Sequence, residues 1–194
     1  LLELHPMSYE QAISKALIKV DEDKVASSWK DSLISGRFKS NISEYLQVPK
    51  KGCFIDRRKM EIINREYTIH QIWSIGGETG WYYGDWLWSL RGFIDKLYGG
   101  VGSRRGRTNK HDIHAGDALD FWRVLYANKE EGKLILFAEM KLPGEAWLEF
   151  KIIGNTLYQS ATFRPRGIWG KLYWYSVLPF HGFIFNGMLN KLIK

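Results

Sequence analysis

The chain has 194 residues, of which 45% are hydrophobic and 25% charged, which is typical of a globular domain with a buried core and excludes a disordered chain. The net charge is +7, but the basic excess is spread out: Lys and Arg outnumber Asp and Glu by 11 to 8 in residues 1–60, 7 to 6 in 61–115 and 10 to 7 in 116–194. No segment therefore carries the concentrated basic patch of a nucleic-acid-binding domain.

Cysteine usage and the start of the chain bear on the compartment. Cys53 is alone, so it forms no intrachain disulfide, and the pattern favours a reducing compartment; we therefore expect a cytoplasmic location. The first residues, LLELHPMSYEQ, have no basic region before an apolar run, so we expect no signal peptide. They also lack an initiator Met, so we expect a fragment or a processed product.

The N-terminal part of the chain predicts a short helical segment. Ser8 is placed to cap a helix that runs to Val20, and apolar residues recur between them at helical spacing. A Pro-Lys-Lys-Gly turn follows at 49–52. We therefore divide the chain into a helical tail, residues 1–56, and a main domain, residues 57–194.

Two segments with different periods come next. Residues 61–75 are rich in Ile, Tyr and Trp, which favour strands, so we predict a strand that ends before a Gly-Gly pair. Residues 80–98 switch to helical spacing, with apolar side chains three or four residues apart and Gly99 directly after them. They predict an amphipathic helix with one apolar face.

Two short motifs after this helix resemble functional patterns. The stretch GGVGSRRGR at 99–107 combines glycines with arginines, but its spacing does not match the dinucleotide fingerprint and it follows a helix rather than a strand. We interpret it as a connecting loop. His111 and His114 would need further ligands to hold a metal ion, so we interpret them as surface histidines and expect no metal.

The stretch from Gly116 to Phe163 contains four β-like runs in succession, each closed by a turn signal. Short strands with regular turns predict an antiparallel meander. The runs cover 119–126, 134–142, 145–153 and 157–163.

The pair Pro143-Gly144 predicts a two-residue turn between the second and third runs. Such a turn pairs Glu139 with Leu148 and leaves both faces of the strand pair largely apolar. It also places Glu139 and Glu149 on opposite faces, so these carboxylates would not form a paired acid and base.

The end of the chain predicts one more strand and a closing helix. Residues 168–178 are rich in Trp and Tyr, and 179–193 have Pro179 at the first helical position and apolar residues four apart. Polar residues interrupt the apolar stretch 172–193, so we expect no membrane-spanning helix. The predicted fold class is α+β: a curved antiparallel sheet gripped by helices, one of them C-terminal, after a short helical N-terminal segment.

Several blocks of the chain resemble a bacterial domain of unknown function that is typically fused behind an NmrA-like, short-chain-dehydrogenase-type Rossmann domain. The blocks are GDALDFWRV (116–124), AEMKLPGEAWLEF (138–150), FRPRGIWGKLYWY (163–175) and LPFHGFIFNGML (178–189), with GCFIDRR (52–58) and LHPMSYEQAI (4–13) resembling the boundary and the tail of the Rossmann partner. The chain lacks the Rossmann nucleotide loop. The resemblance therefore implies no cofactor in this chain and places any NAD(P) in a missing partner domain.

The predicted order of elements is also similar to the START-like helix-grip fold, in which a long C-terminal helix covers a cavity over a curved sheet. The closing helix predicted here is short for that fold. The resemblance implies a pocket for an apolar or aromatic small molecule. The candidate ligand-binding residues are Asp120, Trp122, Arg123, Glu139, Trp147, Arg164, Tyr175 and His181.

Three functions are compatible with these patterns. The first is a small-molecule-binding domain accessory to an NmrA-like reductase, in which an Arg123–Glu139 ion pair across neighbouring strands would satisfy both charges. The second is an isomerase or cyclase that uses Glu139 or Asp120 as a general base and His181 as an acid. The third is an interaction module whose exposed aromatic residues dock onto the Rossmann partner or a second copy.

Overall fold

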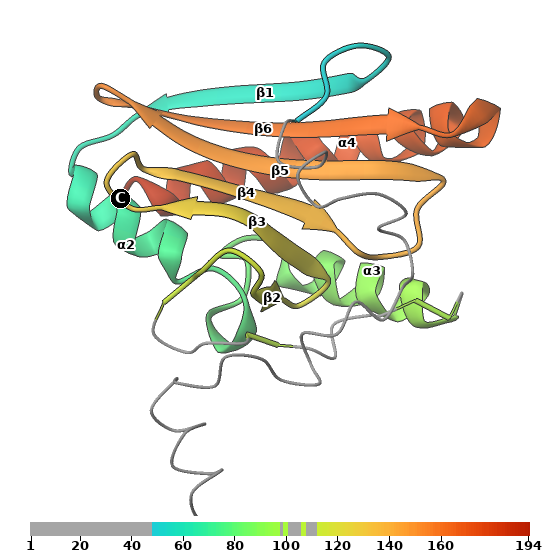
Figure 1. Ribbon diagram of the computed structural model, residues 1–194, viewed down its shortest axis with the longest axis horizontal. Helices are drawn as coiled ribbons and strands as arrows, with labels where there is room; N and C mark the ends of the chain where they lie inside the picture. The colour runs from blue at the N-terminus through green and yellow to red at the C-terminus, as the bar shows by residue number, and fades with distance from the viewer. Residues whose placement is uncertain (1–47, 98, 101–105, 108–111) are drawn as a thin grey trace, which may run out of the picture. The chain divides into compact units, whose positions relative to one another are not determined.

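The computed structural model describes residues 48–97, 99–100, 106–107 and 112–194. These residues form a six-stranded antiparallel sheet in the order β1-β6-β5-β4-β3-β2, which is followed by a long C-terminal helix (Figure 1). The predicted α+β class, with an antiparallel sheet and a C-terminal helix, is confirmed. The helix predicted between Ser8 and Val20 lies outside the described residues.

The predicted meander is present as four consecutive antiparallel strands. The strands of the sheet are β1 (Phe54–Glu61), β2 (Ala118–Leu119), β3 (Trp122–Asn128), β4 (Lys133–Ala138), β5 (Gly144–Ile153) and β6 (Thr156–Pro165). Gly154 begins the two-residue turn between β5 and β6 with φ of 56°, a left-handed conformation that glycine adopts at little cost. The Gly154-Asn155 turn signal read from the sequence therefore marks the end of β5 and the start of β6.

The connection between β4 and β5 differs from the prediction. Residues 139–143 all lie between the two strands, so Pro143 does not begin a two-residue turn. Leu136 lies opposite Leu148, and Glu149 lies opposite Ile135. This is an odd shift from the predicted pairing, and an odd shift moves one strand's side chains to the other face.

The predicted separation of Glu139 and Glu149 is therefore wrong. Glu149 lies on the face that carries Ile135 and Phe137. Glu139 lies on the same face, because it pairs with Arg123, whose position in β3 is opposite Phe137. The two carboxylates still do not form an acid–base pair, since Glu139 is engaged by Arg123 beyond the end of β4.

The segment 61–75, predicted as a strand, is mostly helical. The first strand, β1, ends where that segment begins, and Arg65–Trp73 forms helix α2. Asn64 caps this helix, because its side-chain oxygen accepts a hydrogen bond from a backbone N–H of the first turn. The cap and the complete burial of Ile72 in the core override the β-propensity of the segment.

Helix α3 (Asp85–Leu97) lies within the segment predicted as an amphipathic helix. A short 3₁₀ turn, η3 (Gly77–Thr79), precedes it. The Asp85 carboxylate accepts a hydrogen bond of 2.7 Å from the Trp81 N–H, which fixes the chain as it enters the helix. This prediction is confirmed.

Helix α4 (Gly167–Leu192) has 26 residues and replaces both the last predicted strand, 168–178, and the short closing helix, 179–193. Pro179 lies inside it rather than at its start and removes one backbone hydrogen bond. Packing stabilises the first half instead: the Trp174 ring stacks on Phe54 at 5.5 Å and on Phe163 at 5.9 Å. The closing helix is therefore long.

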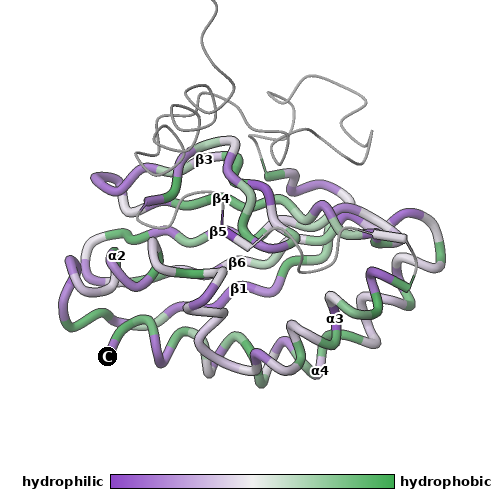
Figure 2. Tube along the Cα trace, turned by 90° about the horizontal axis from the view of Figure 1, so that it is seen from below, coloured by the Kyte–Doolittle hydropathy of each residue, from purple (hydrophilic) through white to green (hydrophobic). Residues whose placement is uncertain are grey.

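Helices α2, α3 and α4 lie on the same side of the sheet (Figure 2). The main core fills the space between them and includes Leu136, Leu148 and Met188, all fully buried. A smaller apolar cluster lies on the other face of the sheet and consists of Leu125, Ile135, Phe137 and Trp147. The prediction that both faces of the sheet are apolar is confirmed.

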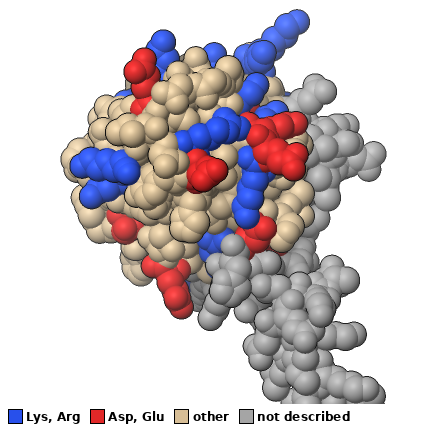
Figure 3. Space-filling view, turned by 90° about the vertical axis from the view of Figure 1, so that its left-hand side faces the viewer, with Lys and Arg blue, Asp and Glu red and all other residues tan. Residues whose placement is uncertain are grey.

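Charged side chains of both signs are interspersed on the face shown in Figure 3. Arg58 pairs with Asp56 at 3.0 Å and also donates a hydrogen bond to Asn186 of α4. This face presents no large patch of a single sign, which agrees with the even spread of charge along the sequence.

Candidate functional site

A cavity of about 420 Å³ lies between the sheet and helices α3 and α4. Its wall is formed largely by apolar side chains from three parts of the fold. They include Leu87, Trp88, Leu90 and Ile94 of α3, Trp122, Met140, Leu142, Ala146, Leu148, Ala161 and Phe163 of the sheet and its loops, and Trp174, Val177, Ile184 and Phe185 of α4. Volume and lining are typical of a small-molecule site.

Arg91 and Tyr173 bring charge and polarity to this wall from α3 and α4. The Arg91 guanidinium carbon lies 5.7 Å from the centre of the Tyr173 ring, a cation–π geometry. Burial raises the pKa of the Tyr173 hydroxyl, while the neighbouring Arg91 opposes the rise. The phenol is therefore a neutral hydrogen-bond donor across the physiological pH range.

His181 forms another part of the wall. Its ring packs against Trp174 at 5.1 Å and Phe185 at 4.7 Å, and its Nδ1 lies 3.6 Å from Asp56 Oδ2. Burial lowers the pKa of His181, Asp56 opposes this by its charge, and Arg58 adds to it. Because the net shift is downward, the imidazole is neutral at physiological pH.

Three indole groups of the wall have unsatisfied donors. The Nε1 atoms of Trp88, Trp122 and Trp147 are buried and have no hydrogen-bond partner among the described residues. A buried donor without a partner costs about 1–3 kcal/mol. All three residues line the cavity, and Trp122 and Trp147 were predicted to do so.

Arg123 and Glu139 form the predicted ion pair. Arg123 Nε lies 3.2 Å from Glu139 Oε1, Nη2 lies 3.3 Å from Oε2, and Nη1 donates a hydrogen bond of 2.6 Å to the Gly116 carbonyl. Both side chains are almost fully buried, at 6% and 0% exposed. The pair lies on the sheet face away from the helices, so neither residue reaches the cavity.

Asp120 belongs to the tight turn between β2 and β3. Its φ of 53° is left-handed, a conformation that Asp tolerates in such turns. Its Oδ2 accepts a hydrogen bond of 2.9 Å from Trp81 Nε1. Burial raises the pKa of Asp120, and hydrogen bonds from Trp81 and from the Gly77 backbone oppose the rise. Asp120 is not part of the cavity wall, and its contacts are those of a turn residue.

The other predicted site residues lie at the edges of the cavity or outside it. Trp147 contributes to the wall, but its ring packs edge-on against Phe137 on the opposite face of the sheet, with the Arg164 guanidinium carbon 5.6 Å from its centre. Arg164 also forms an ion pair with Glu145 on the surface. Tyr175 is 62% exposed and packs against Phe54.

The structure therefore brings Trp122, Trp147 and His181 to the cavity and separates them from Asp120 and Glu139. The described wall contains no carboxylate. This geometry does not support Glu139 or Asp120 as a general base that acts with His181 on a molecule in the cavity.

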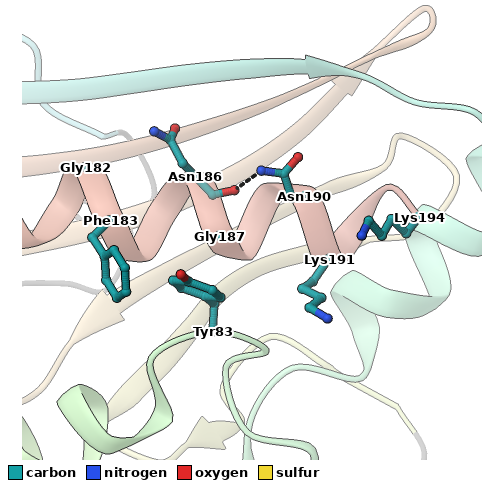
Figure 4. Close-up of a pocket in the computed structure, with 8 residues that line it drawn as sticks. All are labelled: Tyr83, Gly182, Phe183, Asn186, Gly187, Asn190, Lys191 and Lys194. Atoms are coloured by element: carbon teal, nitrogen blue, oxygen red, sulfur yellow. Dashed lines mark hydrogen bonds between the residues drawn. The ribbon is translucent and has the colours of Figure 1, made fainter.

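A second hollow lies on the outer side of α4 and has a volume of about 480 Å³ (Figure 4). Figure 4 shows the Tyr83 ring below Gly187 and beside Phe183, and the Asn190 side chain donating to the Asn186 carbonyl. Most of its lining residues are exposed, including Lys191 and Lys194. The hollow is a surface groove, and the more apolar cavity between the sheet and helices α3 and α4 is the stronger candidate site.

Among the residues that the structure describes, no group of three His, Cys, Asp or Glu side chains could hold a metal ion. His114 lies near Asp112 and Asp117, at 3.9 Å and 3.8 Å, while His111 lies outside the described residues. Within the same part of the chain, no helix has both the length and the apolar character needed to cross a membrane.

Sequence analysis missed several residues of the wall, among them Arg91 and Tyr173, and for Arg91 the sequence holds a signal. Arg91 stands four residues after Leu87 and three before Ile94, inside the apolar stripe of the helix. A charged residue in the middle of such a stripe was the signal that could have found it, because helical spacing directs it toward the same side as its apolar neighbours.

Fold and site together define a class of protein: an α+β domain in which two helices and an antiparallel sheet line an apolar cavity. The chain matches the family described as "Protein of unknown function (DUF2867)" over residues 50–188, which is most of its length, and it belongs to this family. Searches of the curated proteins and of the solved structures found no match. The match confirms the resemblance to a domain of unknown function, while the Rossmann partner remains a prediction.

Proposed function

We propose that this domain binds an apolar or aromatic small molecule in the cavity between the sheet and helices α3 and α4. The observation that supports this proposal is the cavity itself, with about 420 Å³ of space and a wall dominated by Trp, Leu, Ile and Phe side chains. Apolar side chains normally pack against one another, so a hollow of this size lined by them is a usual place for a small-molecule ligand.

A direct test uses N-phenyl-1-naphthylamine, an uncharged aromatic dye whose fluorescence rises in apolar surroundings. We expect saturable enhancement with one site per chain. Native mass spectrometry of freshly purified protein, repeated after denaturation, would identify any molecule that is carried through purification. The proposal fails if the dye shows no saturable binding and the protein has only its bare mass.

Filling the cavity provides a second test. Ala161 of β6 is 8% exposed and lines the wall, so Ala161→Leu would place additional methyl groups in the open space. We expect dye affinity to fall at least about tenfold while the thermal midpoint is kept or raised, because the added groups bury apolar area without removing a contact. Ala115→Leu, the same change at an exposed position, should leave the affinity unchanged.

The accessory role extends this proposal and rests on the sequence resemblance. In that role, the domain would hold the ligand of a fused or partner NmrA-like reductase, and NAD(P) would bind to the Rossmann domain. Reductase activity that requires the cavity, and is lost in Ala161→Leu, would support it. A reductase that is equally active without this domain would exclude it.

Exposed apolar side chains favour a second candidate, an interaction module. Trp86, Phe93 and Leu97 of α3 are 59–69% exposed, as are Ile168 and Trp169 of α4 at 69% and 74%. Groups of exposed apolar residues often mark protein contacts. We take a second copy of the chain as the partner to test: sedimentation velocity should show a dimer that Trp86→Ser and Trp169→Ser dissociate. A monomer at every concentration would exclude this partner.

A further inference from the structure

The cavity wall has an uneven electrostatic character. The described wall includes no Asp or Glu, whereas Arg91 contributes a full positive charge. An apolar ligand makes no use of this charge, because an apolar group placed against the guanidinium would remove water from it without offering a partner. The position of Arg91 therefore calls for a separate explanation.

Arg91 has no acidic partner within the described part of the chain. No carboxylate there lies within ion-pair distance of its guanidinium. Asp95, the nearest acid on the same helix, is 1% exposed, and its Oδ1 accepts a hydrogen bond of 2.6 Å from the Lys141 backbone N–H. The neighbour of Arg91 that lines the cavity is Tyr173, which is neutral.

We propose that the cavity takes an anionic amphiphile: a carboxylic acid whose aliphatic or aromatic body fills the apolar space and whose carboxylate binds Arg91 and the Tyr173 hydroxyl. This inference rests on the proposed function and specifies its ligand. A guanidinium and a carboxylate match in geometry as a two-pronged pair, and a hydrogen bond to a charged group is stronger than one between neutral groups.

The other polar groups of the wall agree with this class. The unsatisfied groups of Trp88 and Trp122 are N–H donors, and oxygen atoms on a ligand would satisfy them. His181 is held neutral by burial and adds no second charge. The wall therefore offers one cation and several donors, a set that selects an acceptor-rich monoanion over a cation.

The experiment compares ligands of equal tail length that differ only in the head group. Dodecanoate, 1-dodecanol and dodecyltrimethylammonium are used to displace N-phenyl-1-naphthylamine from the full chain at about pH 8, where a carboxylic acid is ionised. We expect dodecanoate to bind at least about tenfold more tightly than 1-dodecanol, and the cation to bind most weakly.

Variants locate the head group. Arg91→Met keeps the length of the side chain and removes its charge, so dodecanoate affinity should fall at least about tenfold, while dye and 1-dodecanol affinities stay within about threefold. Arg91→Lys should recover part of the loss. Lys96→Met, which removes an exposed charge from the same helix outside the wall, should change none of the affinities. Circular dichroism and the thermal midpoint check that each variant is folded.

The outcomes separate the two proposals. If the dye does not bind, the proposed function fails and this inference fails with it. If the dye binds but dodecanoate shows no advantage over 1-dodecanol, the cavity is an apolar site and the anionic ligand is excluded. If dodecanoate keeps its advantage in Arg91→Met, another group recognises the carboxylate and the assignment of Arg91 is wrong.

Discussion

Replacing Glu139 with Leu breaks the buried ion pair with Arg123. The substitution leaves the Arg123 guanidinium buried and charged, with the Gly116 carbonyl as its remaining partner among the described residues. Two charge-assisted hydrogen bonds, at 3.2 Å and 3.3 Å, are lost. Each is worth about 1.5 kcal/mol or more, so their sum reaches the range of about 3–5 kcal/mol that is typical of breaking a buried pair on one side.

The assay is urea unfolding, followed by tryptophan fluorescence and far-UV circular dichroism. A single domain of this size has about 5–15 kcal/mol of stability, so Glu139→Leu should lower the denaturation midpoint strongly while the slope of the transition is unchanged. The double variant Arg123→Met with Glu139→Leu removes both charges. It should recover most of the loss, because a buried pair replaced by apolar side chains is often close to neutral.

Two results would refute this reasoning. A loss below about 1 kcal/mol in Glu139→Leu would show that water reaches the pair, and an additive loss in the double variant would show that the two charges are not coupled. Since the pair lies on the sheet face away from the cavity, folded variants should bind N-phenyl-1-naphthylamine with unchanged affinity. A change in affinity would contradict the placement of the pair outside the site.

Two further predictions concern helix α4. A Cβ atom at Gly170 would collide with the Pro143 carbonyl oxygen and lie 2.8 Å from the Pro165 Cα, so Gly170→Ala should lower the free energy of unfolding by about 1–3 kcal/mol. In contrast, a Cβ atom at Gly182 on the same helix would meet nothing within 4 Å, so Gly182→Ala should raise the free energy of unfolding by up to about 1 kcal/mol. Urea titrations in which the two variants shift the midpoint in the same direction would contradict this contrast. Burial and Arg58 lower the pKa of His181, while Asp56 opposes the shift, so His181 is protonated in the unfolded chain at a higher pH than in the folded chain. The contribution of His181 to stability is therefore fully present above the unfolded pKa of about 6.5 and is lost as the pH falls through the folded pKa. His181→Phe should therefore lose less stability between about pH 7.5 and about pH 5.5 than the parent chain, and equal losses would assign the pH dependence to other groups.

The meander was predictable because local signals and tertiary structure agree there. Strands β3 to β6 alternate with turns that contain Gly, Asn or Pro, and side chains on both faces are apolar, so no competing pattern exists. The register of β4 and β5 was not predictable, because Pro143 can begin a short turn or end a longer loop, and the local sequence does not distinguish the two.

Segments rich in Trp, Tyr and Ile were misassigned for a common reason. Their β-propensity is a preference for half-buried, packed surfaces, and a helix face can satisfy the same preference. Trp174 does so by stacking on Phe163, and Ile72 by complete burial beside the sheet. Tertiary contacts of this kind cannot be read from spacing alone.

The candidate site was predictable only in part. The need of a buried carboxylate for a partner predicted the Arg123–Glu139 pair correctly, because desolvation of charge depends little on the details of the fold. Which face of the sheet borders the cavity depends on the register, and the sequence alone did not show that Glu139 lies outside the cavity wall. Arg91 was overlooked because its helix was read for its apolar residues.

The position of β1 has a consequence for how the chain acquires its structure. Phe54 pairs with Phe163, so the first strand of the sheet pairs with the last one in the chain. The other described strands, β2 to β5, lie between β1 and β6 in the sequence. Bringing β1 and β6 together closes a long loop, and this costs conformational entropy before the contacts between the two strands can form. The pairing of β1 with β6 is therefore expected to be slow. On the ribosome, β1 emerges about one hundred residues ahead of its partner, and the meander can assemble without it. The sheet is therefore completed late, when synthesis of β6 allows the N-terminal strand to join an already formed edge.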